Sequence, residues 1–425
     1  MTHFSWPQIA RLGLVQSAIG AMVMLSTSLI NRVMVVEYAM AAAVPAGLVA
    51  WHYAVQLSRP AWGHGSDRGG RRTPWIIGGM AVLGTGSMLA VVATVWQALP
   101  LAILAFTLIG AGVGAAGTSV LALLATHTVP ERRAGAASLT WIMMIVGIII
   151  AAGIAGKLLE PFSVERLVAV VGGVALVAFA VAVLGIWGVE RAPVAHTPSA
   201  SPVAFGAAMN EVWADPEARA FTVFVFMSML AYSMQDMILE PFAGLMFAYT
   251  PGQSTSLSGI QHQGVLAGMI LVGFGARTFG GGTARGLRSW TVAGCIGSAV
   301  ALAGLAAAAH VAPNWPIVAN VVLLGFFNGV FAVSAIGSMM ALAGQGGKQR
   351  EGIRMGVWGA AQAIAFGLGG LTGAVGVDTM RALTGTDGLA FSNVFAVEAG
   401  LFLVAAWLAS GAVSSAPARS REALA

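Results

Sequence analysis

The sequence predicts an all-α integral membrane protein with twelve transmembrane helices. Of its 425 residues, 58% are hydrophobic and 9% are charged, whereas about 25% of residues are charged in an ordinary soluble protein. The mean hydropathy is +0.84, and no long polar block remains that could fold in water. The composition therefore excludes both a soluble enzyme and a soluble domain with one membrane anchor.

The first six apolar runs each approach the length of about 20 residues that crosses a bilayer. The first run continues from Leu12 through Ile30 into Asn31 and Arg32 without the small-residue pattern of a cleavage site, so it predicts a helix rather than a signal peptide. We place these six spans at 12–35, 40–60, 75–95, 98–127, 136–158 and 166–188.

The longest polar stretch, from Gly188 to Arg219, contains four prolines among Ser, Thr and Ala. It predicts a linker between the sixth and seventh helices. Six further spans follow, at 220–247, 257–276, 290–311, 316–343, 355–377 and 388–412. The predicted domains are an N-terminal six-helix half (1–188), a cytoplasmic linker (189–219) and a C-terminal six-helix half (220–425).

The distribution of basic residues predicts the orientation. An even number of spans puts both termini on one side, and 17 of the 21 Lys and Arg residues fall on that side. The positive-inside rule then predicts cytoplasmic termini. The net charge of +5 predicts contact with anionic membrane lipids rather than with nucleic acid, because the basic residues are scattered between apolar spans. The four basic residues on the opposite side are Arg32, Lys157, Arg166 and Arg381.

An internal repeat relates the two halves. Four pairs of identical residues are separated by a constant offset of 210. They are Gly63 with Gly273, Gly65 with Gly275, Gly70 with Gly280, and His52 with His262. An Arg also precedes a Trp by eight residues in both halves, as Arg133 with Trp141 and Arg350 with Trp358. Together these matches predict duplicated halves related by a pseudo-twofold axis along the membrane normal.

The loop after the second span carries a specific motif. Its pattern is G-x-x-x-D-R-x-G-R-R, formed by Gly63, Asp67, Arg68, Gly70, Arg71 and Arg72. The glycines allow a tight turn, and the aspartate can cap a helix or pair with a cytoplasmic arginine. At this place in the chain the motif resembles that of the major facilitator superfamily, which implies that superfamily's fold. The alternative is a plain solvated basic turn.

Three further stretches resemble one group within that superfamily. They read NRVMVVE at 31–37, MQDMILEP at 234–241 and GVWGAAQAIA at 356–365. These stretches resemble the PucC/LhaA group, the bacteriochlorophyll delivery family. The resemblance implies a factor in the intracytoplasmic photosynthetic membrane, with bacteriochlorophyll as bound cargo and with light-harvesting or reaction-centre polypeptides as possible partners.

Polar residues inside the spans are candidates for gating. At a rise of 1.5 Å per residue, Arg32 lies about 30 Å from Leu12, toward the non-cytoplasmic end. Asp236 and Glu240 are one turn apart and share a helix face, so we expect Arg32 to pair with one of them and hold the halves together. Glu37, five residues after Arg32, is expected to point elsewhere. The alternative is that Arg32 and Glu37 reach the lipid headgroups. The full predicted set is Asn31, Arg32, Glu37, Gln235, Asp236, Glu240 and Gln362.

Two histidines are candidate pigment ligands. The magnesium of a bacteriochlorophyll accepts an axial ligand, commonly a neutral imidazole. His52 and His262 lie in or beside spans and are paired by the repeat. The alternative is that each is a hydrogen-bonded packing residue.

No motif predicts catalysis. The chain has no G-x-x-x-x-G-K-[ST] phosphate loop and no H-E-x-x-H metal pair, and its one cysteine, Cys295, lies in an apolar run. We therefore expect neither an enzyme nor a metal centre.

Three functions remain open. The first is handling of bacteriochlorophyll, and the second is proton-coupled transport of a small amphipathic molecule, with Glu37, Asp236, Glu240 or Glu398 as the titrating group. The third is a scaffold that docks pigment-synthesis enzymes or antenna polypeptides. Because helices one, four, seven and ten contain few charged residues, an apolar or amphipathic cargo fits better than a polar solute.

Overall fold

The computed structural model describes residues 4–59, 62, 71–190, 210, 213–278, 284–345 and 348–412. Within these ranges the regular structure is helical, and no strand occurs. The loop-motif residues Gly63, Asp67, Arg68 and Gly70 lie outside the described residues, as does most of the predicted linker. The boundaries proposed for the two halves therefore stay predictions.

Helices occur where the sequence predicts membrane spans. The first span is one continuous rod of α1 (Trp6–Met24), η1 (Leu25–Leu29), α2 (Ile30–Arg32) and η2 (Val33–Glu37). It is followed by α3 (Ala43–Gln56), α5 (Thr73–Val95), α6 (Leu99–His127), α7 (Pro130–Leu158) and α8 (Val164–Ile186). After the linker come α10 (Pro216–Phe247), α11 (Pro251–Thr278), α12 (Ala284–Val311), α13 (Ile317–Gln345), α14 (Lys348–Thr384) and α15 (Asp387–Ala412).

Ten of these rods are long and apolar enough to cross a membrane. The two that fall short are α3, which has 14 residues, and α11, whose first three turns are rich in Ser and Gln. Polar residues are tolerated in this part of α11 because Ser254, Thr255, Ser258 and Gln261 are buried against protein rather than exposed to lipid. The polar start of α11 belongs to the protein interior.

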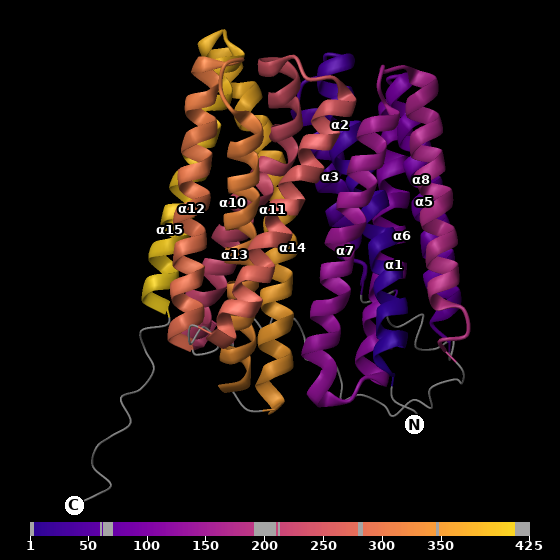
Figure 1. The fold of residues 1–425 in the computed structure, drawn as a ribbon, viewed down its shortest axis with the longest axis vertical. Coiled ribbons are helices and arrows are strands. Elements are labelled where there is room, and N and C mark those ends of the chain that lie inside the picture. The colour runs from indigo at the N-terminus through magenta and orange to yellow at the C-terminus, as the bar shows by residue number, and fades with distance from the viewer. Residues whose placement is uncertain are drawn as a thin grey trace, which may run out of the picture.

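The helices form two bundles with the same internal packing (Figure 1). In the first bundle α1 packs against α7 and α8, and in the second α10 packs against α14 and α15. Likewise, α3 and α5 pack against α6, while α11 and α12 pack against α13. The bundles meet where α7 contacts α11 and α3 contacts α14. This is the two-half architecture predicted from the sequence repeat.

The first helix begins and the last helix ends on the same side of the molecule (Figure 1). We call this side the terminal face and the opposite side the far face. The bundles approach most closely toward the far face, at Gly156 of α7 and Gly252 of α11. A Cβ on Gly156 would lie 2.7 Å from the Gly252 carbonyl oxygen, and one on Gly252 would lie 2.4 Å from that of Gly156. Only glycine permits backbones to lie this close.

Candidate functional site

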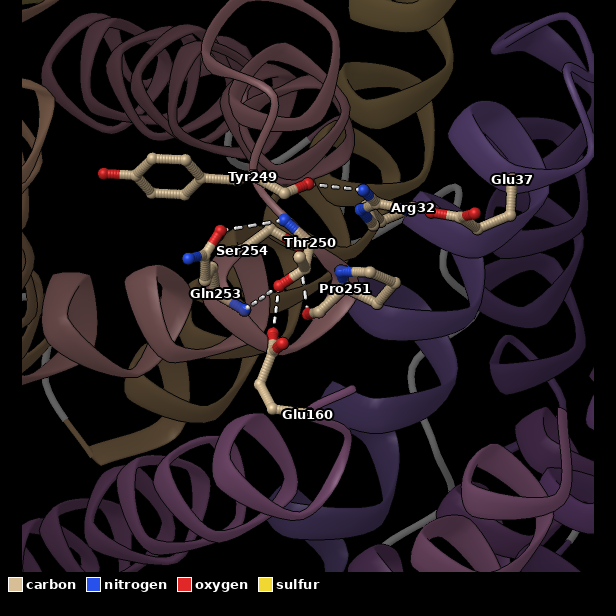
Figure 2. A network of polar contacts seen from close by, with 8 residues as sticks. All are labelled: Arg32, Glu37, Glu160, Tyr249, Thr250, Pro251, Gln253 and Ser254. Carbon is tan, nitrogen blue, oxygen red and sulfur yellow. Dashed lines mark hydrogen bonds and ion pairs between the residues drawn. The ribbon is translucent and has the colours of Figure 1, made fainter. Parts of the chain in front are cut away.

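Arg32 connects the two bundles at the far face (Figure 2). Its side chain is 2% exposed, and its Nη1 lies 2.5 Å from Oε1 of Glu37. Its Nη2 donates a 2.6 Å hydrogen bond to the carbonyl oxygen of Tyr249, in the turn between α10 and α11. The Tyr249 ring points away from Arg32, so only the backbone of this residue takes part. The guanidinium of the first bundle is thus held by a backbone acceptor of the second.

The pairing of Arg32 with Glu37 corrects the expectation that the two side chains point apart. Val33–Glu37 is a π-helix, in which the hydrogen bond runs from residue i to residue i+5. Residues five apart therefore lie over one another, whereas in an α-helix residues three and four apart do so. The wider turn brings Glu37 back onto the face that carries Arg32.

Glu240 is not the hydrogen-bonded partner that the sequence predicted for Arg32. Its carboxyl lies within electrostatic range of Arg32 and near the hydroxyls of three α11 residues, Ser254, Thr255 and Ser258. Neither carboxyl oxygen is at hydrogen-bonding geometry with any described group, and the Thr255 hydroxyl is also unpaired. Glu240 and these hydroxyls therefore form a buried polar cluster between α10 and α11.

Thr250 makes a second connection across the bundles (Figure 2). Its hydroxyl bonds to the carboxylate of Glu160, which follows α7. Thr250 and Gln253 also form a capping box at the start of α11, with bonds of 3.0 Å from the Thr250 N–H to Gln253 Oε1 and 3.2 Å from the Gln253 N–H to Thr250 Oγ1. The sequence T-P-G-Q is a recognisable helix start, but nothing in it indicates Glu160 as the partner.

Two further contacts join the bundles in the same region. The Asn31 side-chain amide donates to the Met237 carbonyl oxygen at 2.8 Å. The Asp378 carboxylate of α14 accepts from the backbone N–H groups of Ala42 and Ala43 at 3.2 and 2.8 Å, where α3 begins. With Arg32 and Thr250, these bonds hold the far face closed.

Asp236 and Glu240 share a helix but have different surroundings. Asp236 is half-buried, and it lies close enough to Tyr53 and Tyr232 to interact electrostatically with both. Those two rings flank Phe366 at 5.9 and 5.8 Å. Asp236 therefore lies beside an aromatic cluster shared by α3, α10 and α14.

The two predicted glutamines take different positions. Gln235 is fully buried, and within the described part of the chain its amide has no hydrogen-bond partner. Gln362 is half-buried in α14, and the structure gives it no specific contact with the other candidate residues.

His52 is closed to a ligand. It is 1% exposed, and its Nε2 lies 2.8 Å from the Gln56 amide nitrogen. Because Gln56 Oε1 accepts from Arg59, that amide nitrogen is a donor and His52 Nε2 is the acceptor. The remaining nitrogen, Nδ1, is buried without a partner among the described residues. The repeat pairs His52 with His262, but the structure gives them different environments.

His262 differs from His52 in its exposure and in its hydrogen bonding. Its Nδ1 lies 2.9 Å from the Ser258 carbonyl oxygen, which can only accept, so Nδ1 carries the proton. In the neutral ring the lone pair is then on Nε2, for which the described structure shows no partner. His262 is half-buried and lies one turn beyond Ser258, on the side of α11 that approaches α10. Val265 and Met269, about one and two turns further along, pack with Ile145 of α7.

The described end of the loop motif is anchored to the first bundle. The backbone N–H of Arg72 donates to both Glu190 carboxylate oxygens at 2.9 and 3.0 Å, and Thr73 donates to the same carboxylate. Arg71 is exposed. Glu190 thus caps the start of α5, a role that its position in the sequence did not indicate.

The chain matches a known protein family along most of its length. The family model described as PUCC protein matches residues 29–416, which is most of the chain. The chain belongs to this family. Among its relatives, the bacteriochlorophyll synthase 44.5 kDa chain of Rhodobacter capsulatus is 52% identical over 416 residues and is covered over 96% of both chains. Protein PucC of Rhodobacter capsulatus is 29% identical, over 94% of this chain and 90% of that protein.

Solved structures of low sequence similarity share the fold. A mutant of the nucleoside transporter NupG has a TM-score of 0.72 at 12% identity, covering 95% of this chain and 99% of the transporter. A bacterial homologue of the human lysosomal transporter Spinster, in an inward-facing and occupied conformation, has a TM-score of 0.67 at 14% identity and 96% coverage of both chains. The PUCC chain therefore has the major facilitator superfamily fold, as its loop motif and repeat predicted.

Proposed function

We propose that this PUCC-family protein binds a bacteriochlorophyll and delivers it to light-harvesting or reaction-centre polypeptides in the photosynthetic membrane. Family membership and the names of the relatives support a role in the assembly of photosynthetic pigment complexes. The role is proposed to be non-catalytic, and both termini are proposed to be cytoplasmic. The pigment is cargo that enters between the two bundles from the terminal face.

The state of His262 carries this proposal. A neutral imidazole with a free Nε2 is a suitable axial ligand for the magnesium of a tetrapyrrole, and a backbone acceptor on the other nitrogen fixes the ring in the required tautomer. The apolar side chains of Ile145, Val265 and Met269, which join the bundles beyond His262, supply a wall suited to the macrocycle.

A matched pair of variants tests the assignment. We expect His262→Phe to lose most of the pigment that co-purifies with the protein, because the ligand is removed while a ring of similar size remains. His52→Phe, at the equivalent repeat position, is expected to retain the pigment. Absorption spectra normalised to protein measure both. Equal retention in the two variants would refute His262 as the ligand, although not pigment binding itself.

A proton-coupled carrier is the second candidate, because three carboxyl groups lie deep in the second bundle. Glu240 and Glu398 are buried without hydrogen-bond partners among the described residues, and Asp236 is within electrostatic range of Glu398. Ionisable groups inside a membrane commonly mark proton relays. Proton release from purified protein on addition of cargo would favour this function, and its loss in Glu398→Gln would identify the group.

A scaffold is the third candidate, in which the protein docks pigment-synthesis enzymes or antenna polypeptides on its outer surface. Such a protein would carry those partners without stoichiometric pigment. Purification of the native complex separates this function from delivery.

A further inference from the structure

The four basic residues on the far side differ in the contacts that their charged groups make within the protein. Arg32 pairs with Glu37, and Arg166 donates to the Glu160 carbonyl oxygen. Arg381 pairs with Asp378 at 3.0 Å and with Asp387 at 2.5 Å. Lys157 is exposed, and within the described part of the chain its ammonium group has neither a hydrogen bond nor an ion pair. Of this set, it is the one cation whose charged group makes no polar contact with the described residues.

Lys157 borders a cavity at the seam between the bundles. The cavity has a volume of about 340 Å³ and lies between the end of α7 and the start of α11. Its other polar lining residues include Tyr249, Gln253 and Glu160. Glu160 already accepts from Thr250, while the Gln253 amide nitrogen and the Tyr249 hydroxyl have no partners among the described residues. Besides the Glu160 carboxylate, which Thr250 already occupies at one oxygen, the free polar groups named here are the Lys157 ammonium, the Gln253 amide and the Tyr249 hydroxyl. All three can donate to a phosphate.

The rest of the cavity lining is apolar and adjoins the membrane. Leu257, Ile260 and Val318 line it, and Val318 is 43% exposed. Leu158, next to Lys157, is 56% exposed. The cavity lies where α7 ends and α11 begins, and the ends of membrane-spanning helices lie at headgroup depth. A lysine at this depth reaches the headgroup region with its ammonium group.

We propose that this cavity binds the headgroup of an anionic phospholipid. The phosphate takes a charge-assisted hydrogen bond from Lys157 and further hydrogen bonds from Gln253 and Tyr249, while an acyl chain follows Ile260 and Val318. Because Lys157 belongs to one bundle and Gln253 to the other, the lipid bridges the seam and stabilises the closed far face. This site is separate from His262 and does not depend on pigment binding.

Native mass spectrometry of the pigment-free protein tests the proposal with phosphatidylglycerol and phosphatidylcholine as probes. We expect selective retention of phosphatidylglycerol, which Lys157→Gln weakens about tenfold, the value of one charged hydrogen bond. Arg71→Gln is the matched control, because it removes an exposed cation on the terminal face. Gln253→Leu and Lys157→Glu are expected to weaken retention as well.

Three outcomes would overturn the proposal. Equal retention of phosphatidylglycerol by the wild type and Lys157→Gln would show that the lysine does not bind the lipid. An equal loss of phosphatidylglycerol in Arg71→Gln would show that retention depends only on the net charge of the protein. Competition by millimolar inorganic phosphate, without dependence on the lipid's acyl chains, identifies a soluble anion rather than a lipid. Each result is independent of whether His262 binds a pigment.

Discussion

Arg32 joins the two bundles through a charge-assisted hydrogen bond. It bonds to Glu37 within its own rod and to the Tyr249 carbonyl oxygen of the other bundle. Gly244 of α10 makes room for the guanidinium, since a Cβ there would lie 3.1 Å from Nη2. A hydrogen bond involving a charged group contributes about 1.5–3 kcal/mol, so this residue is a sensitive point for testing closure.

We predict that Arg32→Ala lowers the thermal midpoint of the purified protein and opens the far face. The Tyr249 carbonyl loses its donor, at a cost of about 1.5–3 kcal/mol. Glu37→Gln, which leaves the Tyr249 bond in place, is the control and is expected to have a smaller effect. Reaction of a buried Thr255→Cys with a thiol reagent, in a Cys295→Ala background, reports opening. Unchanged reactivity in Arg32→Ala would contradict the role given to this residue.

The sequence predicted which charged side chains lie inside the membrane and how deep they lie, but it did not predict which of them pair. The sequence indicated Arg32 and Glu240 as intramembrane groups, and both are buried. It did not indicate that Arg32 pairs with Glu37, because the π-helix at Val33–Glu37 has no signature in the pattern of residues. Nor could the repeat distinguish His52 from His262, because the difference depends on the neighbours of each ring.

At the scale of elements, the crossing of α7 and α11 determines how closely the bundles approach. Gly156 and Gly252 face one another, and Ser256 lies beside them. Small residues at such a crossing let backbones make many van der Waals contacts. The same small residues leave space beside Lys157 for the cavity at the seam.

We predict that Gly156→Ala destabilises the protein and Gly153→Ala does not. A Cβ on Gly156 would lie 2.1 Å from Ser256 Oγ and 2.7 Å from the Gly252 carbonyl oxygen, so the helices must separate, at about 1–3 kcal/mol. A Cβ on Gly153 meets nothing within 4 Å, and alanine there gains up to about 1 kcal/mol of helix propensity. Thermal midpoints in detergent measure both. Equal midpoints would mean that the crossing is looser than described.

Helix positions were predictable because apolar runs of bilayer length are a strong signal. The predicted start of the eighth span, at 257, was late, since α11 begins at Pro251. Hydropathy placed the boundary after the polar residues, but the capping box of Thr250 and Gln253 extends the helix through them. These residues are buried by α10 and α7, so protein contacts rather than lipid decide where the helix begins.

At the scale of the whole molecule, the hydrogen bonds of Asn31, Arg32, Thr250 and Asp378 join the bundles toward the far face. Deeper in the molecule the bundles also meet through α7 and α11, where Ile145 packs with Val265 and Met269, and through α3 and α14. Because the hydrogen bonds lie toward the far face, we propose that a cargo reaches His262 from the terminal face and that release on the other side requires the bonds to break.

We predict one-sided access to position 262. His262→Cys, in a Cys295→Ala background, should react with a membrane-impermeant thiol reagent applied to the terminal face and not to the far face. Arg71→Cys and Gln97→Cys are the controls for the two faces. Labelling of inside-out and right-side-out vesicles measures the access of the reagent to each face. Because the termini are proposed to be cytoplasmic, position 262 should react in inside-out vesicles. Reaction only from the far side would contradict the closed state described.

Purification of the wild-type protein from photosynthetic membranes in mild detergent tests pigment delivery most directly. An absorption spectrum measures bound bacteriochlorophyll, and mass spectrometry identifies any associated polypeptides. We expect about one pigment per chain, the stoichiometry of a single axial ligand at His262. Antenna or enzyme polypeptides recovered without stoichiometric pigment would contradict delivery and favour a scaffold.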